Sequence, residues 1–258
     1  MDVVREKMRK TGKSKRRESL LAEKDERKMK KDIGFFQRVY CWICRWVIYG
    51  GLRLMFRPKV RYLNKKAVKE YRNKPAIFIF NHTTLYDGLF AFAMFGGYKC
   101  YILTAKDWYE KKHIKTIFEG NRIVPIDRKG LDTAWLRDCV KIIKGGESVG
   151  IFPEGQRSTS GTLAEFKSGF TLLAQMSGAP IIPVYLSGKY SKFIGARKKI
   201  LIGEPMELTP AENKMSADYL AAESERFRQY MLFLADKSIE IFGASAVAAA
   251  SDKVVEQQ

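Results

Sequence analysis

The chain has 258 residues, 46% of them hydrophobic, and a formal net charge of +19. This apolar content excludes a chain that is disordered throughout, and the length suits one full α/β domain with a sizeable core and a small appendage. The basic excess predicts an anionic partner, namely nucleic acid, an anionic membrane surface or a phosphorylated substrate, and charge by itself does not choose among them.

Residues 1–32 are rich in Lys and Arg, with Glu and Asp among them and few large apolar side chains. We interpret this segment as a basic N-terminal arm, which is either a solvated tail or a polybasic stretch attracted to anionic lipid. Charged residues occur throughout it, so no cleavable signal peptide is recognisable.

Residues 33–57 are mostly aromatic and aliphatic, and no apolar run reaches the roughly 20 residues that span a bilayer. Arg38, Arg45 and Arg53 share one face of a helix, because they recur at spacings of seven and eight. We expect an interfacial amphipathic helical segment with these arginines at the lipid headgroups. The alternative is a helix packed on the core with its arginines in solvent. Gly50-Gly51 is expected to break or kink it.

Residues 58–243 alternate between strand and helix patterns and are expected to form one α/β domain. The expected strands cover 59–63, 76–81, 100–104, 122–126, 148–152, 181–187 and 198–203. The expected helices cover 86–96, 107–119, 132–144, 168–177 and 216–242, with Asp132 as the cap of the third. This order predicts a mostly parallel central sheet flanked by helices, with its chemistry at the carboxyl ends of the strands. Residues 244–258 are expected to be a flexible tail.

The four cysteines do not indicate a metal site. Cys41 and Cys44 form one C-x-x-C, but no second pair completes a zinc site, and His113 is distant in sequence. Small apolar residues in a reducing compartment are the favoured interpretation, with no metal.

The stretch FIFNHTTLYDG, residues 78–88, holds one of the two histidines of the chain. His82 ends a predicted strand, and Asp87 falls in the first turn of the next helix, which Thr83 or Thr84 is placed to cap. An aspartate on one ring nitrogen leaves the other nitrogen free as a base. This pair by itself favours a structural hydrogen bond over a catalytic role.

Three further strand ends carry charge or proline. GNRIVPIDR ends in Asp127-Arg128, IFPEGQRS contains Glu154, Gly155 and Arg157, and APIIPVYLSG contains Pro183. A guanidinium matches phosphate oxygens, and a glycine lets a ligand approach the backbone, so these ends favour a phosphate site over surface ion pairs.

NHTTLYD, GNRIVPIDR, FPEGQRS and IIPVYL, in this order, resemble the four motif blocks of the PlsC-like glycerolipid acyltransferases over roughly residues 59–210. The resemblance implies His82 as general base and Asp87 as its orienting carboxylate. It implies acceptor binding by Glu154, Gly155, Arg157, Arg128 and Lys106. It also implies an acyl-CoA or acyl-carrier protein donor, with no cofactor beyond this co-substrate.

The activity expected from this resemblance is acyl transfer to 1-acyl-sn-glycerol 3-phosphate, which gives phosphatidic acid. Another lysolipid, or glycerol 3-phosphate, is an alternative acceptor. Two further alternatives are a thioesterase with water as acceptor and a non-enzymatic basic binder. Expected partners are a lysophospholipid, the acyl donor and an anionic membrane surface, with no nucleic acid. The expected location is the cytoplasmic face of a membrane, peripheral or monotopic.

Overall fold

The computed structural model describes residues 35–84, 86–95, 98–109, 122–127, 133–158, 162–187, 198–211 and 215–243. The chain divides into two compact units, Met1–Cys41 and Trp42–Gln258. The predicted basic arm (1–32) and tail (244–258) lie outside the described residues, and the predicted division at residues 32, 57 and 243 stays a prediction.

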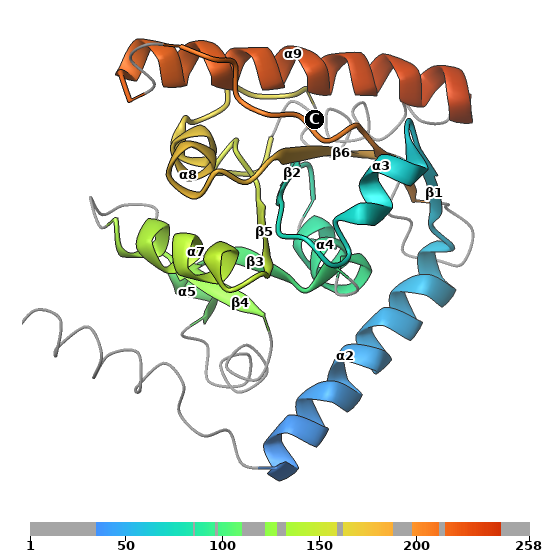
Figure 1. Ribbon diagram of the computed structural model, residues 1–258. Helices are drawn as coiled ribbons and strands as arrows, with labels where there is room; N and C mark the ends of the chain where they lie inside the picture. The colour runs from blue at the N-terminus through green and yellow to red at the C-terminus, as the bar shows by residue number, and fades with distance from the viewer. Residues whose placement is uncertain are drawn as a thin grey trace, which may run out of the picture. The chain divides into compact units, whose positions relative to one another are not determined.

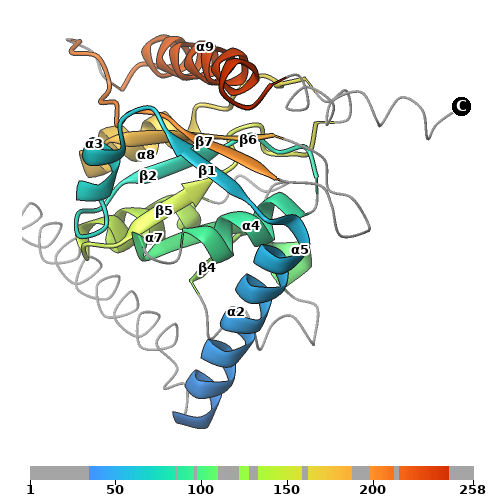
Figure 2. The ribbon, with the colours of Figure 1, turned by 90° about the vertical axis from the view of Figure 1, so that its right-hand side faces the viewer.

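The second unit is built on a seven-stranded sheet in the order β1-β7-β6-β2-β5-β3-β4 (Figures 1 and 2). Its strands are β1 (Lys59–Tyr62), β2 (Ile77–Phe80), β3 (Cys100–Ala105), β4 (Ile123–Ile126), β5 (Ser148–Ile151), β6 (Ile181–Ser187) and β7 (Lys199–Ile202). Every neighbouring pair is parallel except β6 and β7. This confirms the seven predicted strands and the mostly parallel α/β architecture.

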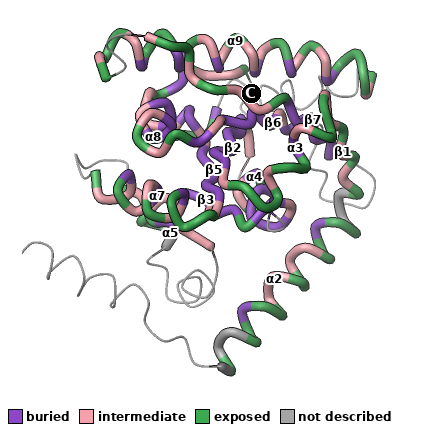
Figure 3. The backbone as a smooth tube through the Cα atoms, in the orientation of Figure 1, coloured by how far each residue is buried: buried purple, intermediate pink, exposed green. Residues whose placement is uncertain are grey.

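Two apolar cores lie on opposite faces of the sheet, because successive side chains of a strand point to opposite faces. In β2, Ile77 and Ile79 join the core under α7 (Ala134–Lys144), α8 (Gly169–Ser177) and α9 (Ala217–Phe242). Phe78 and Phe80 join the core under α2 (Phe35–Phe56), α3 (Lys65–Glu70) and α4 (Tyr86–Met94). Figure 3 shows the buried residues concentrated along the strands between these two helical layers. All four β2 residues are buried, as expected for a central parallel strand.

Three details differ from the sequence-based predictions. Helix α2 runs through Gly50 and Gly51 without a break, so the predicted interruption is wrong. Helix α7 has Thr133 at its N-cap, without a side-chain bond, and Asp132 lies outside the described residues. The short helix α3, capped by the side chain of Asn64, was not predicted. Helix α5 is described over Lys106–Tyr109, and the rest of the predicted helix 107–119 is outside the described residues.

Helix α2 has one face on the core and one exposed apolar face. Leu52 is buried in the core, and the Arg45 guanidinium lies 5.2 Å from the centre of the Phe92 ring in α4. Burial lowers the pKa of Arg45. Arg45 is thus half-buried against the domain, and its placement at lipid headgroups stays a prediction. None of the helices in the described part of the chain is long and apolar enough to cross a bilayer.

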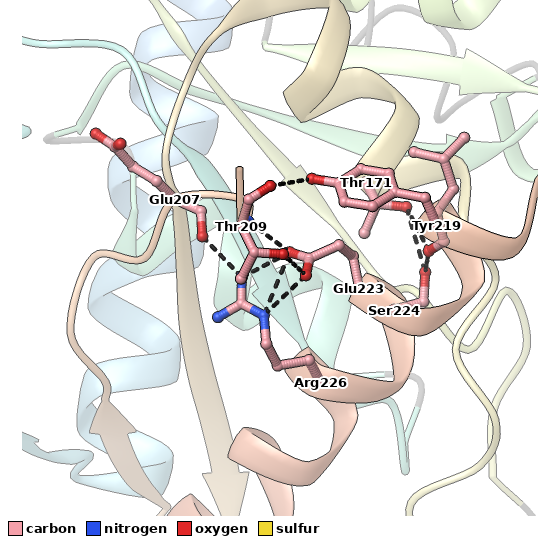
Figure 4. A network of polar contacts seen from close by, with 8 residues as sticks. Thr171, Glu207, Thr209, Tyr219, Glu223, Ser224 and Arg226 are labelled. Carbon is pink, nitrogen blue, oxygen red and sulfur yellow. Dashed lines mark hydrogen bonds and ion pairs between the residues drawn. The ribbon is translucent and has the colours of Figure 1, made fainter. Parts of the chain in front are cut away.

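Helix α9 is joined to the rest of the domain by a polar network (Figure 4). The carboxylate of Glu223 accepts hydrogen bonds from the Thr209 amide and hydroxyl at 3.2 and 2.6 Å and from Arg226 at 2.7 Å. Burial acts to raise the pKa of Glu223, but the bonds from Arg226 and Thr209 outweigh it and hold that pKa below its ordinary value. These bonds tie the first half of α9 to the segment that follows β7.

Candidate active site

The sheet brings the sequence-predicted motifs together at one edge. Strands β5 and β6 flank β2 and run parallel to it, so the three carboxyl ends point the same way. Strand β7 is antiparallel to β6, with Lys199 opposite Ser187, so the start of β7 also lies at this edge. The residues after β2, after β5 and before β7 therefore converge.

Asn81 extends the pairing of β2 with β6 beyond the last strand residue. Its buried side-chain amide donates to the Leu186 carbonyl at 3.0 Å and accepts from the Leu186 amide at 2.7 Å. The side chain takes the place of a backbone pair, so the chain can leave the sheet after Asn81 without leaving β6 unsatisfied. The next residue, His82, starts from this fixed point.

His82 and Asp87 lie together, as the sequence predicted. The His82 Nδ1 atom is 3.4 Å from Asp87 Oδ2, and the same oxygen accepts the backbone amides of Thr83 and Thr84 at 2.7 Å each. Thr83 and Thr84 thus hold the carboxylate through their amides; neither hydroxyl caps α4 among the described residues. The imidazole packs on the Phe152 ring with centroids 4.5 Å apart.

The two side chains of this pair differ in exposure. Asp87 is fully buried, whereas the His82 side chain is 20% exposed. Among the described residues, the contacts of the His82 ring nitrogens involve Nδ1 alone. An imidazole with one nitrogen on a carboxylate and the other open to a ligand has the arrangement of a general base.

Lys198 is a site residue that sequence reasoning did not single out. Its Nζ lies 3.4 Å from Asp87 Oδ1, and both side chains are fully buried. Burial lowers the pKa of Lys198, while the negative charge of Asp87 acts in the opposite direction. The available signal is a pair of lysines, Lys198 and Lys199, at the start of the predicted strand 198–203.

Glu154 faces the backbone of the His82 loop. Its Oε1 accepts the His82 amide at 2.7 Å, and its Oε2 accepts the Ala164 amide at 3.0 Å. Burial raises the pKa of Glu154, and the two amide bonds oppose this shift. The Ser158 amide donates to the His82 carbonyl at 2.8 Å. Both peptide groups of His82 are therefore held by the segment after β5, and both oxygens of Glu154 are engaged.

Two cations border this segment. Gly155 has a positive φ of 68°, and a Cβ on it would come within 3.0 Å of the Lys167 side chain, so glycine suits this turn. Arg157 is exposed and directly precedes Ser158, whose amide bonds His82. Within the described residues, neither Arg157 nor the Lys167 ammonium takes part in an ion pair. Both residues therefore lie close to the segment that holds the His82 backbone.

The other predicted residues lie further along the same edge or outside the described residues. Lys106 opens α5, directly after β3. Asp127 follows β4, and Arg128 lies outside the described residues. Among the described residues, no group of three or more His, Cys, Asp and Glu is arranged to hold a metal ion.

Comparison with known proteins gives a consistent result. The family model described as "Acyltransferase" matches residues 59–187, which is half of the chain. The chain is 29% identical over 143 residues to the 1-acyl-sn-glycerol-3-phosphate acyltransferase of Bacillus subtilis, covering 54% of this chain and 71% of that protein. It is 28% identical over 166 residues to a probable 1-acyl-sn-glycerol-3-phosphate acyltransferase of Mycoplasma genitalium, covering 61% of this chain and 57% of that protein.

A plant relative and a solved structure extend the comparison. The match to a chloroplastic 1-acyl-sn-glycerol-3-phosphate acyltransferase of Brassica napus, 43% identical over 53 residues, spans only 20% of this chain and 15% of that protein. Among solved structures, PlsC of Thermotoga maritima, a 1-acyl-sn-glycerophosphate acyltransferase, superposes with a TM-score of 0.53 at 19% identity, covering 74% of this chain and 80% of that one. At this identity the likeness shows a shared fold.

Proposed function

Because this chain belongs to the acyltransferase family and is an O-acyltransferase, we propose that its acceptor is 1-acyl-sn-glycerol 3-phosphate and its product phosphatidic acid. The names of the Bacillus and Mycoplasma relatives support this acceptor. The observation that carries the proposal is the His82–Asp87 pair, in which Nδ1 faces a buried carboxylate and the ring is partly exposed.

The proposed reaction uses the imidazole twice. His82 Nε2 removes the proton of the acceptor hydroxyl as that oxygen attacks the thioester carbonyl carbon. The C–S bond then breaks, and the imidazolium returns the proton to the sulfur that leaves. Asp87 stabilises the imidazolium, and the substrate alcohol takes the role that a serine has in a serine hydrolase. The donor is an acyl-CoA or an acyl-carrier protein, and the proposed reaction uses no cofactor beyond this co-substrate.

We assign the acceptor phosphate to the cations that follow β5. Arg157 is exposed next to the residue that bonds the His82 carbonyl, and Lys167, which directly precedes the N-cap of α8, lies against Gly155. A guanidinium fork and an ammonium bind phosphate oxygens by charge-assisted hydrogen bonds. Lys106 and Arg128 extend this positive charge in the proposal. A thioesterase would have no use for such a phosphate site.

Helix α2 supplies a surface for the membrane in this proposal. At about 100° per residue its large exposed apolar side chains gather on one side, opposite Arg45 and Leu52. That exposed face includes Val39, Ile43, Trp46, Val47 and Leu54, and Phe36, Tyr40 and Trp42 of the same helix are exposed as well. Aromatic and aliphatic side chains of this kind settle at the lipid headgroup boundary. We propose peripheral or monotopic attachment at the cytoplasmic face, where the lipid acceptor is found.

The test is an in vitro acyl-transfer assay with labelled donor. Lysophosphatidic acid, other lysophospholipids and glycerol 3-phosphate are compared as acceptors, and acyl-CoA is compared with acyl-carrier protein. We expect phosphatidic acid from the wild type and a fall in kcat of about 10²–10⁴-fold in His82→Ala, the usual contribution of a general base. Circular dichroism checks that the variant is folded. Equal rates in the wild type and His82→Ala would exclude the proposed mechanism.

A further inference from the structure

A buried lysine faces the carboxylate of the proposed catalytic pair, and the proposed reaction assigns it no role. Lys198 Nζ lies 3.4 Å from Asp87 Oδ1, and neither side chain is exposed. Removing two charges from water costs several kcal/mol per ion, and a buried pair is often no more stabilising than apolar residues of similar volume. Stability by itself is therefore a weak reason for an ammonium group at this point.

The contacts of Asp87 are divided between its two oxygens. Oδ2 accepts the amides of Thr83 and Thr84 at 2.7 Å and faces His82 Nδ1 at 3.4 Å. Oδ1 faces Lys198. The ammonium therefore adds an ion pair on Oδ1 to the two amide bonds on Oδ2, and together these contacts restrain the rotation of the carboxylate.

We propose that Lys198 is a positioning residue for acyl transfer that acts through Asp87. It orients the His82 imidazole, and it limits how strongly the negative charge of Asp87 stabilises the imidazolium. This proposal rests on the proposed function. Asp87 from α4 and Glu154 from the segment after β5 contact His82, and Lys198 from the start of β7 contacts Asp87. Arg157 directly precedes Ser158, whose amide bonds the His82 carbonyl. Lys198 partly offsets the negative charge of Asp87, so the imidazolium can release its proton to the leaving sulfur.

The first residue of β7 provides a matched control. Lys199 is the neighbouring lysine and is also largely buried, but its Nζ lies 3.4 Å from the carbonyl of Phe242 at the end of α9. Successive side chains of a strand point to opposite faces, which is why Lys198 reaches Asp87 and Lys199 reaches α9. Lys199→Met therefore removes a similarly placed charge without touching the carboxylate.

The experiment compares Lys198→Met, Lys198→Arg and Lys199→Met with the full-length wild type in the acyl-transfer assay. For Lys198→Met we expect kcat to fall about 100-fold, the scale expected when a catalytic group is misplaced by about 1 Å, with the KM for the acceptor nearly unchanged. Lys198→Arg, which keeps the charge, is expected to recover part of this loss, and Lys199→Met is expected to match the wild type. If Lys198→Met does not fold by circular dichroism, Lys198→Gln is measured instead.

A second readout does not depend on turnover. The sequence has two histidines, so His113→Gln leaves His82 as the one imidazole in the NMR spectrum. In that background, Lys198→Met is expected to change the chemical shifts of the His82 ring at a fixed pH, because the carboxylate that orients the ring has lost its ion pair, and Lys199→Met is expected to leave them unchanged. If Lys198→Met also leaves them unchanged, Lys198 does not act on His82.

The outcomes separate the two proposals. If the wild type transfers no acyl group to lysophosphatidic acid, the proposed acceptor is wrong, and the NMR spectrum still tests whether Lys198 acts on His82. If the wild type is active, His82→Ala is inactive, and Lys198→Met equals Lys199→Met in both kcat and the chemical shifts of the His82 ring, the role of Lys198 is refuted and the proposed function stands.

Discussion

Replacing Glu154 by glutamine tests whether this buried carboxylate holds the His82 loop. The wild-type carboxylate accepts two backbone amides, from His82 at 2.7 Å and from Ala164 at 3.0 Å. A glutamine has one carbonyl oxygen, so one of the two amides faces its NH₂ group. Losing a hydrogen bond to a charged group costs about 1.5–3 kcal/mol, and a buried donor without an acceptor costs about 1–3 kcal/mol.

Burial raises the pKa of Glu154 because a buried carboxylate is costly. The uncharged glutamine avoids this cost, and this gain partly offsets the losses. We therefore expect a net loss of about 3 kcal/mol in the free energy of unfolding. For a chain of this size that corresponds to a Tm lower by about 6–12 °C. Because His82 loses a backbone anchor, kcat is expected to fall by about 10–100-fold.

Thermal unfolding followed by circular dichroism gives the change in Tm, and the acyl-transfer assay gives kcat. Glu165→Gln is the matched control, because Glu165 is exposed and adjacent to Ala164, and it should leave both quantities unchanged. A Glu154→Gln protein with the Tm and kcat of the control would refute the idea that Glu154 anchors this loop.

Three further predictions concern the polar network, the phosphate site and the end of β2. Bonds from Arg226 hold the pKa of Glu223 below its ordinary value of 4.5, against the effect of burial. Glu223→Gln should therefore lower the free energy of unfolding by about 2 kcal/mol at pH 7. This difference between variant and wild type, measured by urea unfolding, should shrink as pH falls below 4.5, and a difference that stays constant with pH would contradict the role given to Arg226. Arg157→Ala should raise the KM for the acceptor about 10–100-fold with little change in kcat, whereas exposed Lys74→Ala should not. Asn81→Ala should lower the free energy of unfolding by about 3 kcal/mol, because it leaves a β6 amide unsatisfied, and an unchanged urea midpoint would contradict this.

Local patterns in the sequence were enough to predict the seven strands. The run Ile77–Phe80 is apolar on both faces, which a central parallel strand requires, and the structure buries all four residues. The 3.6-residue period of the apolar residues in α7 likewise predicted that helix, with a start two residues before the observed one. Helix α3 was missed because it is too short to show a period, and its stability comes from the Asn64 cap and the burial of Val68.

The sequence by itself determined the order of the seven strands and the pairing of His82 with Asp87, because both depend on residues close in the chain. Only the tertiary structure decided which distant residues complete that pair. Glu154 lies 72 positions from His82, and it bonds the His82 amide because β5 lies beside β2. Lys198 reaches Asp87 because β7 alone turns back against β6, and neither periodicity nor charge in a linear chain specifies that reversal.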